Sequence, residues 1–308
     1  MSGLRQWAKD ALPPFALDFT RSLRRTLGAR VPRPVVAIDA HRRTHGASPR
    51  LIAPRTFNEK LLHRKLFDRR PLLATLADKF AVRSYVEARL GPGVLPQLIA
   101  CVADPAALPF DRLPSEFVVK PSHGSGWVRI VRDPSTLDRT EFIDLCRRWL
   151  ATNYYDRTGD RIYRNIPPRI LVEELIDDGS GSCPTDYKLF TFDGHVRVIQ
   201  VDTNRFTAHH RDLYTPDWQR LDVVYGYPNS AGGVPRPPHL AQMLAAAETL
   251  GRDLDFIRAD FYDTGRRIVF GELTVTPGNG LDWFRPREFD AQLGAFWTLP
   301  KLHWMPQW

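Results

Sequence analysis

The chain has 308 residues, of which 43% are hydrophobic and 25% charged, a balance that excludes a disordered or fibrous protein. Its net charge of +8 at pH 7 admits a polyanionic partner, but the basic residues are dispersed and no nucleic-acid module motif is present, so we predict no nucleic-acid partner. Because the three cysteines lack metal-ligand spacing, and no signal peptide or long apolar run is present, we predict a cytoplasmic protein with reduced thiols.

Residues 1–55 are predicted to form an N-terminal extension with a basic amphipathic helix. Four apolar residues recur at helical spacing, with arginines on the opposite side: Phe15, Phe19, Leu23 and Leu27. A helix of this kind can contact a membrane surface. We favour the alternative, in which it packs against the rest of the protein. Pro32 and Pro34 predict an irregular stretch after this helix.

A helical lead-in domain is predicted over residues 56–114. The spacing of apolar residues indicates helices over 56–66 and 72–90, and Gly91 ends the second of them. A short strand over 94–102 follows. A proline-rich connection then leads out of this part of the chain.

The next predicted unit, residues 115–180, begins with an apolar strand that ends in Lys120. A loop of small residues and a second strand follow, then a helix over 140–153 and a β-rich run over 169–176. Lys120 and the backbone amides of the loop are placed to meet one anion, because loops of this kind cradle phosphates. A surface turn with a solvated lysine is the alternative that this segment alone leaves open.

The last predicted unit, residues 181–308, contains two hairpins and a helix. Strands over 187–192 and 195–202 flank Asp193-Gly194, a strong two-residue turn signal. An alanine-rich helix is predicted over 240–250. Strands in hairpins interleaved with helices favour an α+β protein over a doubly wound parallel sheet.

Two carboxylates in the second hairpin indicate a metal site. Asp260 and Glu272 stand among apolar strand residues, and the hairpin places them on paired strands. Burying a carboxylate is costly unless a cation compensates it, and hard oxygen ligands suit Mg²⁺. The alternative is that both side chains face solvent.

A polar cluster after the 195–202 strand includes Arg205, His209 and Arg211. Arginine offers a planar fork of donors that suits a carboxylate or a phosphate, so we predict that these residues bind substrate. A solvated turn is the alternative. The tryptophans near the C-terminus, Trp297 among them, are predicted to pack in the core rather than against a sugar.

Several segments resemble the ATP-grasp ligases. The run from Glu272 to Gly278, Glu-Leu-Thr-Val-Thr-Pro-Gly, is similar to the Glu-x-Asn-x-x-Pro-Gly signature of that superfamily, with Thr274 in place of the asparagine. The closest resemblance is to the TupA-like branch, which is associated with bacterial surface-polysaccharide pathways. It covers roughly residues 56–300 and includes these segments: Phe57-Asn58-Glu59-Lys60, Ala77-Asp78-Lys79, Asn153-Tyr154-Tyr155, Asp186-Tyr187-Lys188 and Gln200-Val201-Asp202.

The resemblance implies an ATP-grasp fold in which two α+β subdomains clamp ATP, behind the helical N-terminal lead-in. It implies Mg²⁺ at Asp260, Glu272 and Thr274, and catalytic roles for Arg258 and Lys120. The implied nucleotide contacts are Lys79, Arg83, Lys120, Ser122, His123, Gly124, Ser125 and Gly126 for the phosphates, Glu173, Glu174, Leu175 and Ile176 for adenine, Asp186 for ribose, and Lys188 near the phosphates.

The resemblance therefore implies an ADP-forming enzyme that uses ATP and Mg²⁺ to join a carboxylate to an amine through an acyl phosphate. The acid is expected to be a small molecule or a saccharide, in polysaccharide modification or specialised amide synthesis. Two alternatives stay open: a glycosyltransferase of surface-polysaccharide synthesis, and an ATP-binding module without catalysis.

Overall fold

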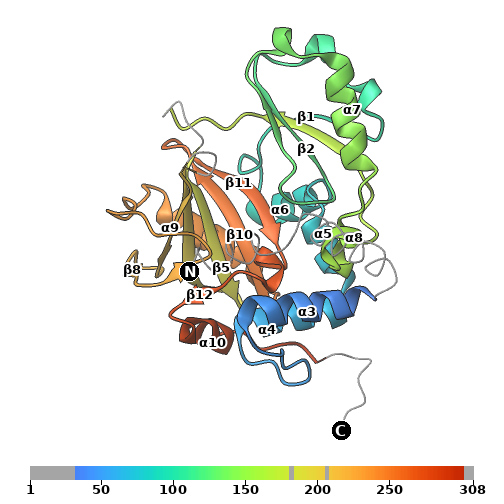
Figure 1. Cartoon of the computed structure of the whole chain (residues 1–308). Helices are drawn as coiled ribbons and strands as arrows, with labels where there is room; N and C mark the ends of the chain where they lie inside the picture. The colour runs from blue at the N-terminus through green and yellow to red at the C-terminus, as the bar shows by residue number, and fades with distance from the viewer. Residues whose placement is uncertain (1–31, 180–183, 205–207, 302–308) are drawn as a thin grey trace, which may run out of the picture.

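A computed structural model describes residues 32–179, 184–204 and 208–301. In these ranges it shows a four-stranded and a six-stranded antiparallel sheet, a third sheet of two short strands, and flanking helices (Figure 1). The amphipathic helix expected over 15–27 and the candidate substrate residue Arg205 lie outside these ranges. No helix in the ranges that are described has both the length and the apolar content needed to cross a membrane.

Among the described residues, four helices precede the first strand: α3 (Arg33–His45), α4 (Phe57–Phe67), α5 (Pro71–Ala77) and α6 (Val82–Leu90). The prediction of an irregular stretch around Pro34 is wrong, because this proline lies in the first turn of α3. A backbone N–H in that turn has no acceptor within the helix, so proline, which lacks the N–H, is tolerated there. The helix expected over 72–90 breaks into α5 and α6. The break places Lys79 in a turn rather than on a helix face.

The small sheet has the strand order β1 (Leu98–Val102), β4 (Ile170–Glu174), β2 (Phe117–Pro121) and β3 (Arg129–Val131). Helix α7 (Arg139–Leu150), capped by the Asp138 carboxylate, covers one face through Phe142 and Cys146. Strand β1 comes from the segment expected to be a helical lead-in. It pairs with β4, so the small sheet takes a strand from before residue 115.

The large sheet has the order β11 (Ile268–Thr274), β10 (Phe256–Asp263), β5 (Asp186–Phe192), β6 (His195–Thr203), β7 (His210–Tyr214) and β8 (Arg220–Leu221). The turn at Asp193-Gly194 joins β5 to β6, as the sequence predicted. The smaller elements are β9 (Val224–Tyr225), β12 (Phe284–Arg285), α8 (Tyr154–Thr158) and the 3-10 turns η1 (Pro105–Ala107), η2 (Phe110–Arg112), η3 (Pro134–Thr136), η4 (Arg161–Tyr163) and η5 (Pro277–Gly280).

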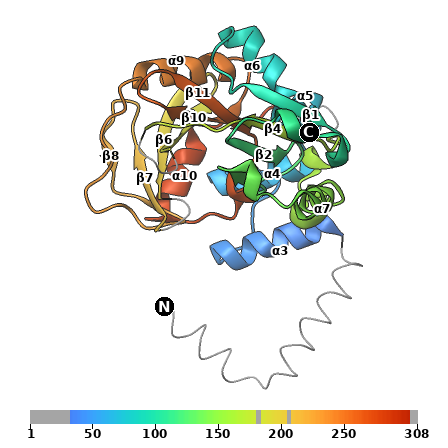
Figure 2. The same cartoon turned by 90° about the horizontal axis from the view of Figure 1, so that it is seen from above.

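The two faces of the large sheet differ because side chains alternate along each strand. One face carries Leu189, Ile199 and Ala259 and packs under α9 (Leu240–Gly251). The opposite face is aromatic at one end, where α4 and α10 (Glu288–Ala295) cover it, as Figure 2 shows. Phe57 and the buried Trp297 pack there, in agreement with the predicted core role of this tryptophan.

Candidate nucleotide and metal site

The other end of that aromatic face is polar. Strand pairing sets Asp260 of β10 opposite Glu272 of β11 on one side and opposite Lys188 of β5 on the other. Lys188 in turn faces Gln200 of β6, and Asp186 faces Asp202. Directly paired residues of neighbouring strands project from the same face of a sheet. A stripe of charged and amide side chains therefore crosses the large sheet, and the expected pairing of the two carboxylates is confirmed.

A bulge sets the position of Glu272. Phe261 pairs with Phe270, whereas the preceding residue of β10, Asp260, pairs with Glu272, so Gly271 is an extra residue in β11. Glycine suits this position because a side chain there would lie 3.2 Å from the Asp260 carbonyl oxygen. The bulge brings the second carboxylate, instead of a glycine, opposite the first.

Asp260 is 2% exposed and is bound by two cations. Arg258 donates from Nε and Nη2 to the two carboxylate oxygens at 2.7 and 2.6 Å, and Lys188 donates to Oδ2 at 2.9 Å. Lys188 also contacts Asp186, which is buried. Burial raises the pKa of Asp260, and Arg258 and Lys188 act against that rise.

Glu272 connects this network to the lead-in helices. Its Oε2 lies 3.4 Å from Lys79 Nζ, and its Oε1 lies 3.4 Å from Arg258 Nη2 and accepts a hydrogen bond from the Thr274 hydroxyl at 3.0 Å. Burial by itself would raise the pKa of Glu272, but Lys79 and Arg258 outweigh it and hold that pKa well below its usual range. Glu272 is therefore ionised at neutral pH.

The oxygen atoms of Asp260, Glu272 and Thr274 fit Mg²⁺. All are hard ligands, and the side chain of Glu272 is 28% exposed, so it can be reached from outside. Among the residues that the structure describes, no group of three or more Asp, Glu, His or Cys side chains is arranged to hold a metal. A pair of carboxylates is nonetheless the donor set that proteins use for Mg²⁺ bound together with nucleotide phosphates.

The loop after β2 approaches this network through Lys79. Lys79 Nζ donates to the Gly124 carbonyl at 2.6 Å, and Lys79 N donates to the Ser122 carbonyl at 3.0 Å. Gly124 packs so closely that a Cβ there would lie 2.4 Å from the Trp127 ring. Ser125 and Gly126 are exposed. The loop therefore presents its tip to solvent while its base is fixed beside Glu272.

The side chains of Ser122 and His123 bind elsewhere. Ser122 is buried, and its hydroxyl donates to Pro167 O at 2.9 Å. His123 Nε2 lies 3.2 Å from both the Trp149 and Thr152 carbonyls, at the C-terminal end of α7. These two side chains hold the loop onto the small sheet, so contact with a phosphate would have to come from their backbone.

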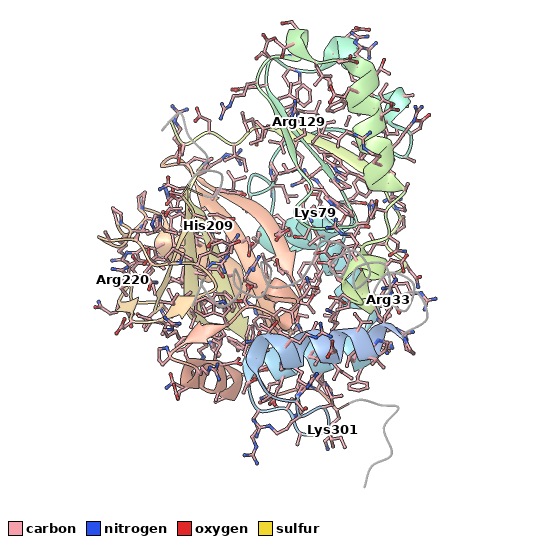
Figure 3. The ribbon with its side chains drawn as sticks, in the orientation of Figure 1. Arg33, Lys79, Arg129, His209, Arg220 and Lys301 are labelled. Carbon is pink, nitrogen blue, oxygen red and sulfur yellow. The ribbon has the colours of Figure 1, made fainter. Side chains whose placement is uncertain are left out.

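Lys120 meets Glu173 rather than the carboxylate pair. Lys120 Nζ lies 2.5 Å from Glu173 Oε2, and Arg83 Nη1 lies 2.9 Å from Glu173 Oε1. Within the described ranges, no ion pair joins Lys120 to Asp260 or Glu272. The predicted convergence of Lys120 with the carboxylate pair is therefore not observed. The lysine that contacts Glu272 is Lys79, which Figure 3 labels.

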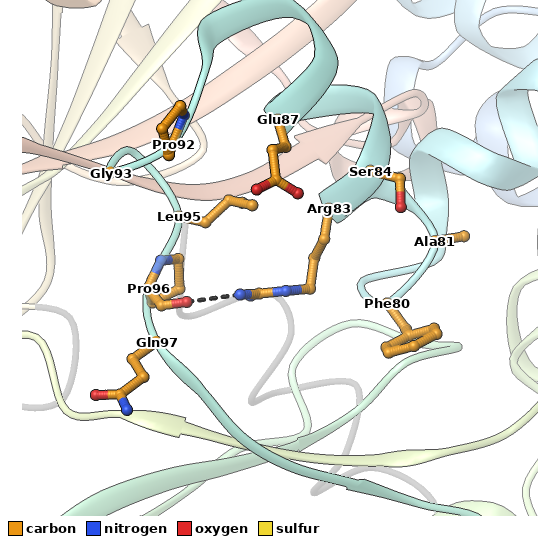
Figure 4. A pocket seen from close by; sticks show the side chains of 10 residues that line it. All are labelled: Phe80, Ala81, Arg83, Ser84, Glu87, Pro92, Gly93, Leu95, Pro96 and Gln97. Atoms are coloured by element: carbon orange, nitrogen blue, oxygen red, sulfur yellow. Dashed lines mark hydrogen bonds between the residues drawn. The ribbon is translucent and has the colours of Figure 1, made fainter.

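A cavity of about 410 Å³ lies beside Arg83, lined by α6 and the segment before β1. In Figure 4, Arg83 crosses this cavity and donates to the Pro96 carbonyl at 2.7 Å. Neither Lys120 nor the carboxylate pair lines it. We place the candidate site at the charged clusters, because this cavity lacks the side chains that a reaction at phosphate needs.

The expected adenine segment continues β4 outward. Glu174 Oε1 accepts from Arg267 Nη2 at 2.8 Å and from Gln97 N at 3.1 Å, so this side chain ties β4 to the hairpin of the large sheet. Leu175 and Ile176 are half-buried and follow β4 outside any helix or strand. Their backbone groups are free of strand pairing, as a segment that binds a base requires.

Arg211 and His209 form a separate cluster around Asp202. Arg211 Nε donates to Asp202 Oδ1 at 2.6 Å, and His209 Nε2 lies 3.3 Å from the same oxygen. The His209 ring lies 3.8 Å from the ring of Tyr227, measured between centroids. Burial would raise the pKa of Asp202, but Arg211 lowers it well below its usual range. The Arg211 fork is therefore already occupied by a carboxylate of the protein.

Gln200 and Asp202 of the polar stripe were not singled out as site residues by the sequence. Gln200 Nε2 donates to Asp202 Oδ2 at 2.9 Å, whereas its buried Oε1 has no hydrogen-bond partner in the part of the chain described. Their spacing in the sequence could have indicated them. Gln200 and Asp202 are two residues apart, as are Asp186 and Lys188 on the other side of the Asp193-Gly194 turn, so a hairpin would bring the two pairs to one face.

Comparison with known proteins bears on this site. A family model described as TupA-like ATPgrasp matches residues 59–298. No match was found among curated protein sequences.

Among solved structures, the chain is similar to D-alanine–D-alanine ligase from Bacillus anthracis in complex with ATP, at 17% identity and a TM-score of 0.40 over 67% of this chain and 56% of that one. It is similar to D-alanine–D-alanine ligase from Helicobacter pylori, at 16% identity and a TM-score of 0.41, over 74% of this chain and 59% of that one. It is also similar to the ATP-grasp ligase PsnB in complex with a phosphomimetic variant of its minimal precursor, Mg and ADP. That match has 15% identity and a TM-score of 0.40, over 73% of this chain and 58% of that one.

The chain thus spans less than two thirds of the length of each of these three ligases. The family model, in contrast, covers most of this chain, from Glu59 to Thr298. The protein therefore belongs to the TupA-like ATP-grasp family and has the α+β fold of that family.

Proposed function

We propose that the protein is an ATP-dependent, ADP-forming ligase that joins a carboxylate to an amine through an acyl phosphate. The observation that carries the proposal is the position of Lys79, which contacts both the Gly124 carbonyl of the loop and the Glu272 carboxylate of the large sheet. An ammonium between a loop of small residues and a carboxylate pair suits a phosphate chain that arrives with a metal ion.

In the proposed reaction, an oxygen of the substrate carboxylate attacks the γ-phosphorus of ATP and ADP leaves. The amine then attacks the carbonyl carbon of the acyl phosphate, loses a proton, and phosphate leaves. Negative charge grows first on the phosphoryl oxygens and then on the carbonyl oxygen, so catalysis requires fixed positive charge at both places. No nucleophilic side chain of the protein takes part.

The cations of the site have distinct proposed roles. Lys79 and Lys120 neutralise phosphate oxygens, and Arg258 stabilises the oxyanion of the tetrahedral intermediate. Asp260 holds Arg258 through two hydrogen bonds, which fixes the orientation of its guanidinium. When Mg²⁺ is bound by Asp260, Glu272 and Thr274, it supplies further charge neutralisation at the phosphates.

The remaining contacts extend this proposal to the whole nucleotide. Residues 115–180 and 181–308 act as the two subdomains that clamp it, with adenine at the Glu173–Ile176 segment and ribose near Asp186. The resemblance to the TupA-like branch supports placing the reaction in polysaccharide modification or specialised amide synthesis in the bacterial cytoplasm. His209 and Arg211, with Arg205, stay candidates for the substrate end.

Release of ADP and of UDP distinguishes this proposal from the alternatives. The purified protein is incubated with MgATP and pairs of acids and amines, including uronic acids and amino acids, or with a sugar nucleotide. We expect ADP release that depends on both an acid and an amine, and its loss in Glu272→Gln with unchanged thermal unfolding. The exposed Glu288→Gln is the matched control. UDP release, or full ADP release by Glu272→Gln, would contradict the proposal.

A further inference from the structure

A second cavity lies between α3 and α8, beside η5. It has a volume of about 210 Å³, and its polar lining is Arg33, Lys65, Arg157, Thr158 and Asn279. We call it the α3–α8 pocket. Three of its lining side chains are cationic, and none of the described residues that line it is acidic.

Lys65 is the most unusual of these cations. It lies on α4, is 2% exposed, and donates no hydrogen bond to any described residue. Burial lowers the pKa of Lys65, and the nearby Asp160 acts against that shift. The Asp160 oxygens accept hydrogen bonds from the Thr276 hydroxyl and from Ile162 N. An ammonium that is buried without a hydrogen bond is costly unless a ligand compensates it.

Arg33 and Arg157 complete the positive wall from two other helices. Arg33 begins α3, where it is half-buried, and Arg157 lies on α8 with its guanidinium carbon 5.4 Å from the Trp127 ring. Figure 3 shows Arg33 at the end of α3 nearest α8. Guanidinium groups present forks of donors that match a carboxylate or a phosphate. The three cations converge from three helices, so this pocket can surround an oxyanion.

The pocket adjoins the candidate site through η5. Asn279, which lines the pocket, belongs to the turn that follows Glu272 and Thr274 of β11. The Tyr154 hydroxyl lies against the side chains of both Asn279 and Ser125 of the loop. One wall of the pocket is therefore shared with the region where phosphate transfer is proposed.

We infer that the α3–α8 pocket binds an anionic group of the substrate, so that one of the two molecules joined by the enzyme carries a carboxylate or phosphate besides the group that reacts. This inference rests on the proposed function and names its substrate class. A volume of about 210 Å³ suits one charged end of a molecule, since pockets that take a whole drug-sized ligand have volumes of about 300–1,000 Å³. The pocket thus selects a dicarboxylate, an acidic sugar or a phosphorylated compound over a neutral analogue.

Anion binding is tested on the full chain without any reaction. The midpoint of thermal unfolding is measured with D-glucuronate, L-glutamate, orthophosphate and neutral L-glutamine, since a ligand that binds only the folded state raises it. We expect at least one anion to raise the midpoint and L-glutamine to leave it unchanged. If the midpoint rises only with glucuronate or glutamate, the group that the pocket binds is a carboxylate. If it rises only with orthophosphate, that group is a phosphate.

Two variants remove the pocket's charge in different ways. Lys65→Met keeps the shape of a buried side chain, whereas Arg157→Gln changes an exposed residue. In each, we expect the affinity for the anion to fall about tenfold or more, with MgATP still raising the midpoint as in the wild type. The matched control is Arg148→Gln, an exposed arginine on α7 outside the pocket, which should keep full anion binding.

The outcomes separate the pocket from the reaction. If no anion raises the midpoint, or if anions protect both pocket variants as well as the wild type, the inference is wrong whatever the enzyme catalyses. If anions protect the wild type and fail with both variants, the pocket is an anion site even where ADP release is never found. Where ADP release is found, the variants should raise the KM of the anionic substrate and leave the KM of ATP unchanged.

Discussion

Lys79 Nζ lies 3.4 Å from Glu272 Oε2, although one residue belongs to a turn between two helices and the other to the edge strand of the large sheet. The same ammonium donates to Gly124 O at 2.6 Å. Lys79 therefore contacts both the base of the loop and the Glu272 carboxylate. A phosphate chain entering between them would meet this ammonium first.

Replacing Lys79 should weaken nucleotide binding. We expect Lys79→Met to lower the affinity for MgATP by about tenfold or more, because it removes a charge-assisted contact in a poorly solvated site. Equilibrium binding of a fluorescent ATP analogue measures this. Arg89→Gln, a half-buried residue of α6 that pairs with Asp253, serves as the control and should bind normally. Unchanged affinity in Lys79→Met would remove Lys79 from the phosphate site.

The close packing of Gly124 against Trp127 gives a second prediction. A Cβ at position 124 would lie 2.4 Å from Trp127 Cζ3, so Gly124→Ala forces the ring or the loop to move. We expect the KM for ATP to rise several-fold while the midpoint of thermal unfolding changes little. Gly232→Ala is the matched control, since no atom lies within 4 Å of a Cβ there. Equal KM values for the two variants would show that the loop shape does not matter.

Arg64 holds α4 to the large sheet. It is fully buried, donates from Nη1 to the Phe256 and Val275 carbonyls at 2.9 and 3.0 Å, and donates from Nη2 to Asp255 at 2.7 Å. Arg64→Met leaves the buried Asp255 with fewer partners, and we expect the free energy of unfolding in denaturant to fall by about 3–5 kcal/mol.

The control for Arg64 is an exposed ion pair. Arg132 lies 3.8 Å from Glu116 on the surface, and Arg132→Met should change the free energy of unfolding by less than about 1 kcal/mol. A loss in Arg64→Met as small as that of the control would mean that Arg64 does not anchor α4.

His41 makes stability depend on pH. Its side chain is 4% exposed, neither ring nitrogen has a hydrogen-bond partner among the described residues, and burial lowers its pKa to about 4. Between the ordinary pKa near 6.5 and this value, the unfolded chain binds the proton and the folded chain does not. The contribution of His41 to the free energy of unfolding therefore falls as the pH drops through this range, by up to about 3 kcal/mol.

His41→Leu should remove that dependence. We expect the variant to be more stable than the wild type by about 1–3 kcal/mol at pH 5, because it buries no unsatisfied nitrogen. Denaturant unfolding at pH 7 and pH 5 measures the effect. A variant that loses stability between these pH values as steeply as the wild type would refute the role of His41.

The hairpins could be predicted from the sequence because their turns are local. The Asp193-Gly194 turn pairs Phe192 with His195, and continuing that register would set Lys188 opposite Ile199. A shift between Phe190 and Thr191 sets Lys188 opposite Gln200 instead. Bulges respond to packing across the whole sheet, so the sequence reveals the polar residues of a strand before it reveals which of them meet.

The cation clusters could not be predicted in the same way. The sequence identified Lys120, but its partner Glu173 comes from a strand that follows a helix and a long connection, and the pairing depends on the order of the small sheet. Arg33, Lys65 and Arg157 lie on three helices, and only tertiary packing brings them to one pocket. A contact between distant segments leaves no periodic signal in a single sequence.

The most direct test of the account is a crystal structure of the protein with Mg²⁺ and a non-hydrolysable ATP analogue. We predict Mg²⁺ on the oxygens of Asp260 and Glu272, with the phosphates in contact with Lys79 and Lys120. A nucleotide bound in the cavity beside Arg83, with no metal at the carboxylate pair, would contradict it.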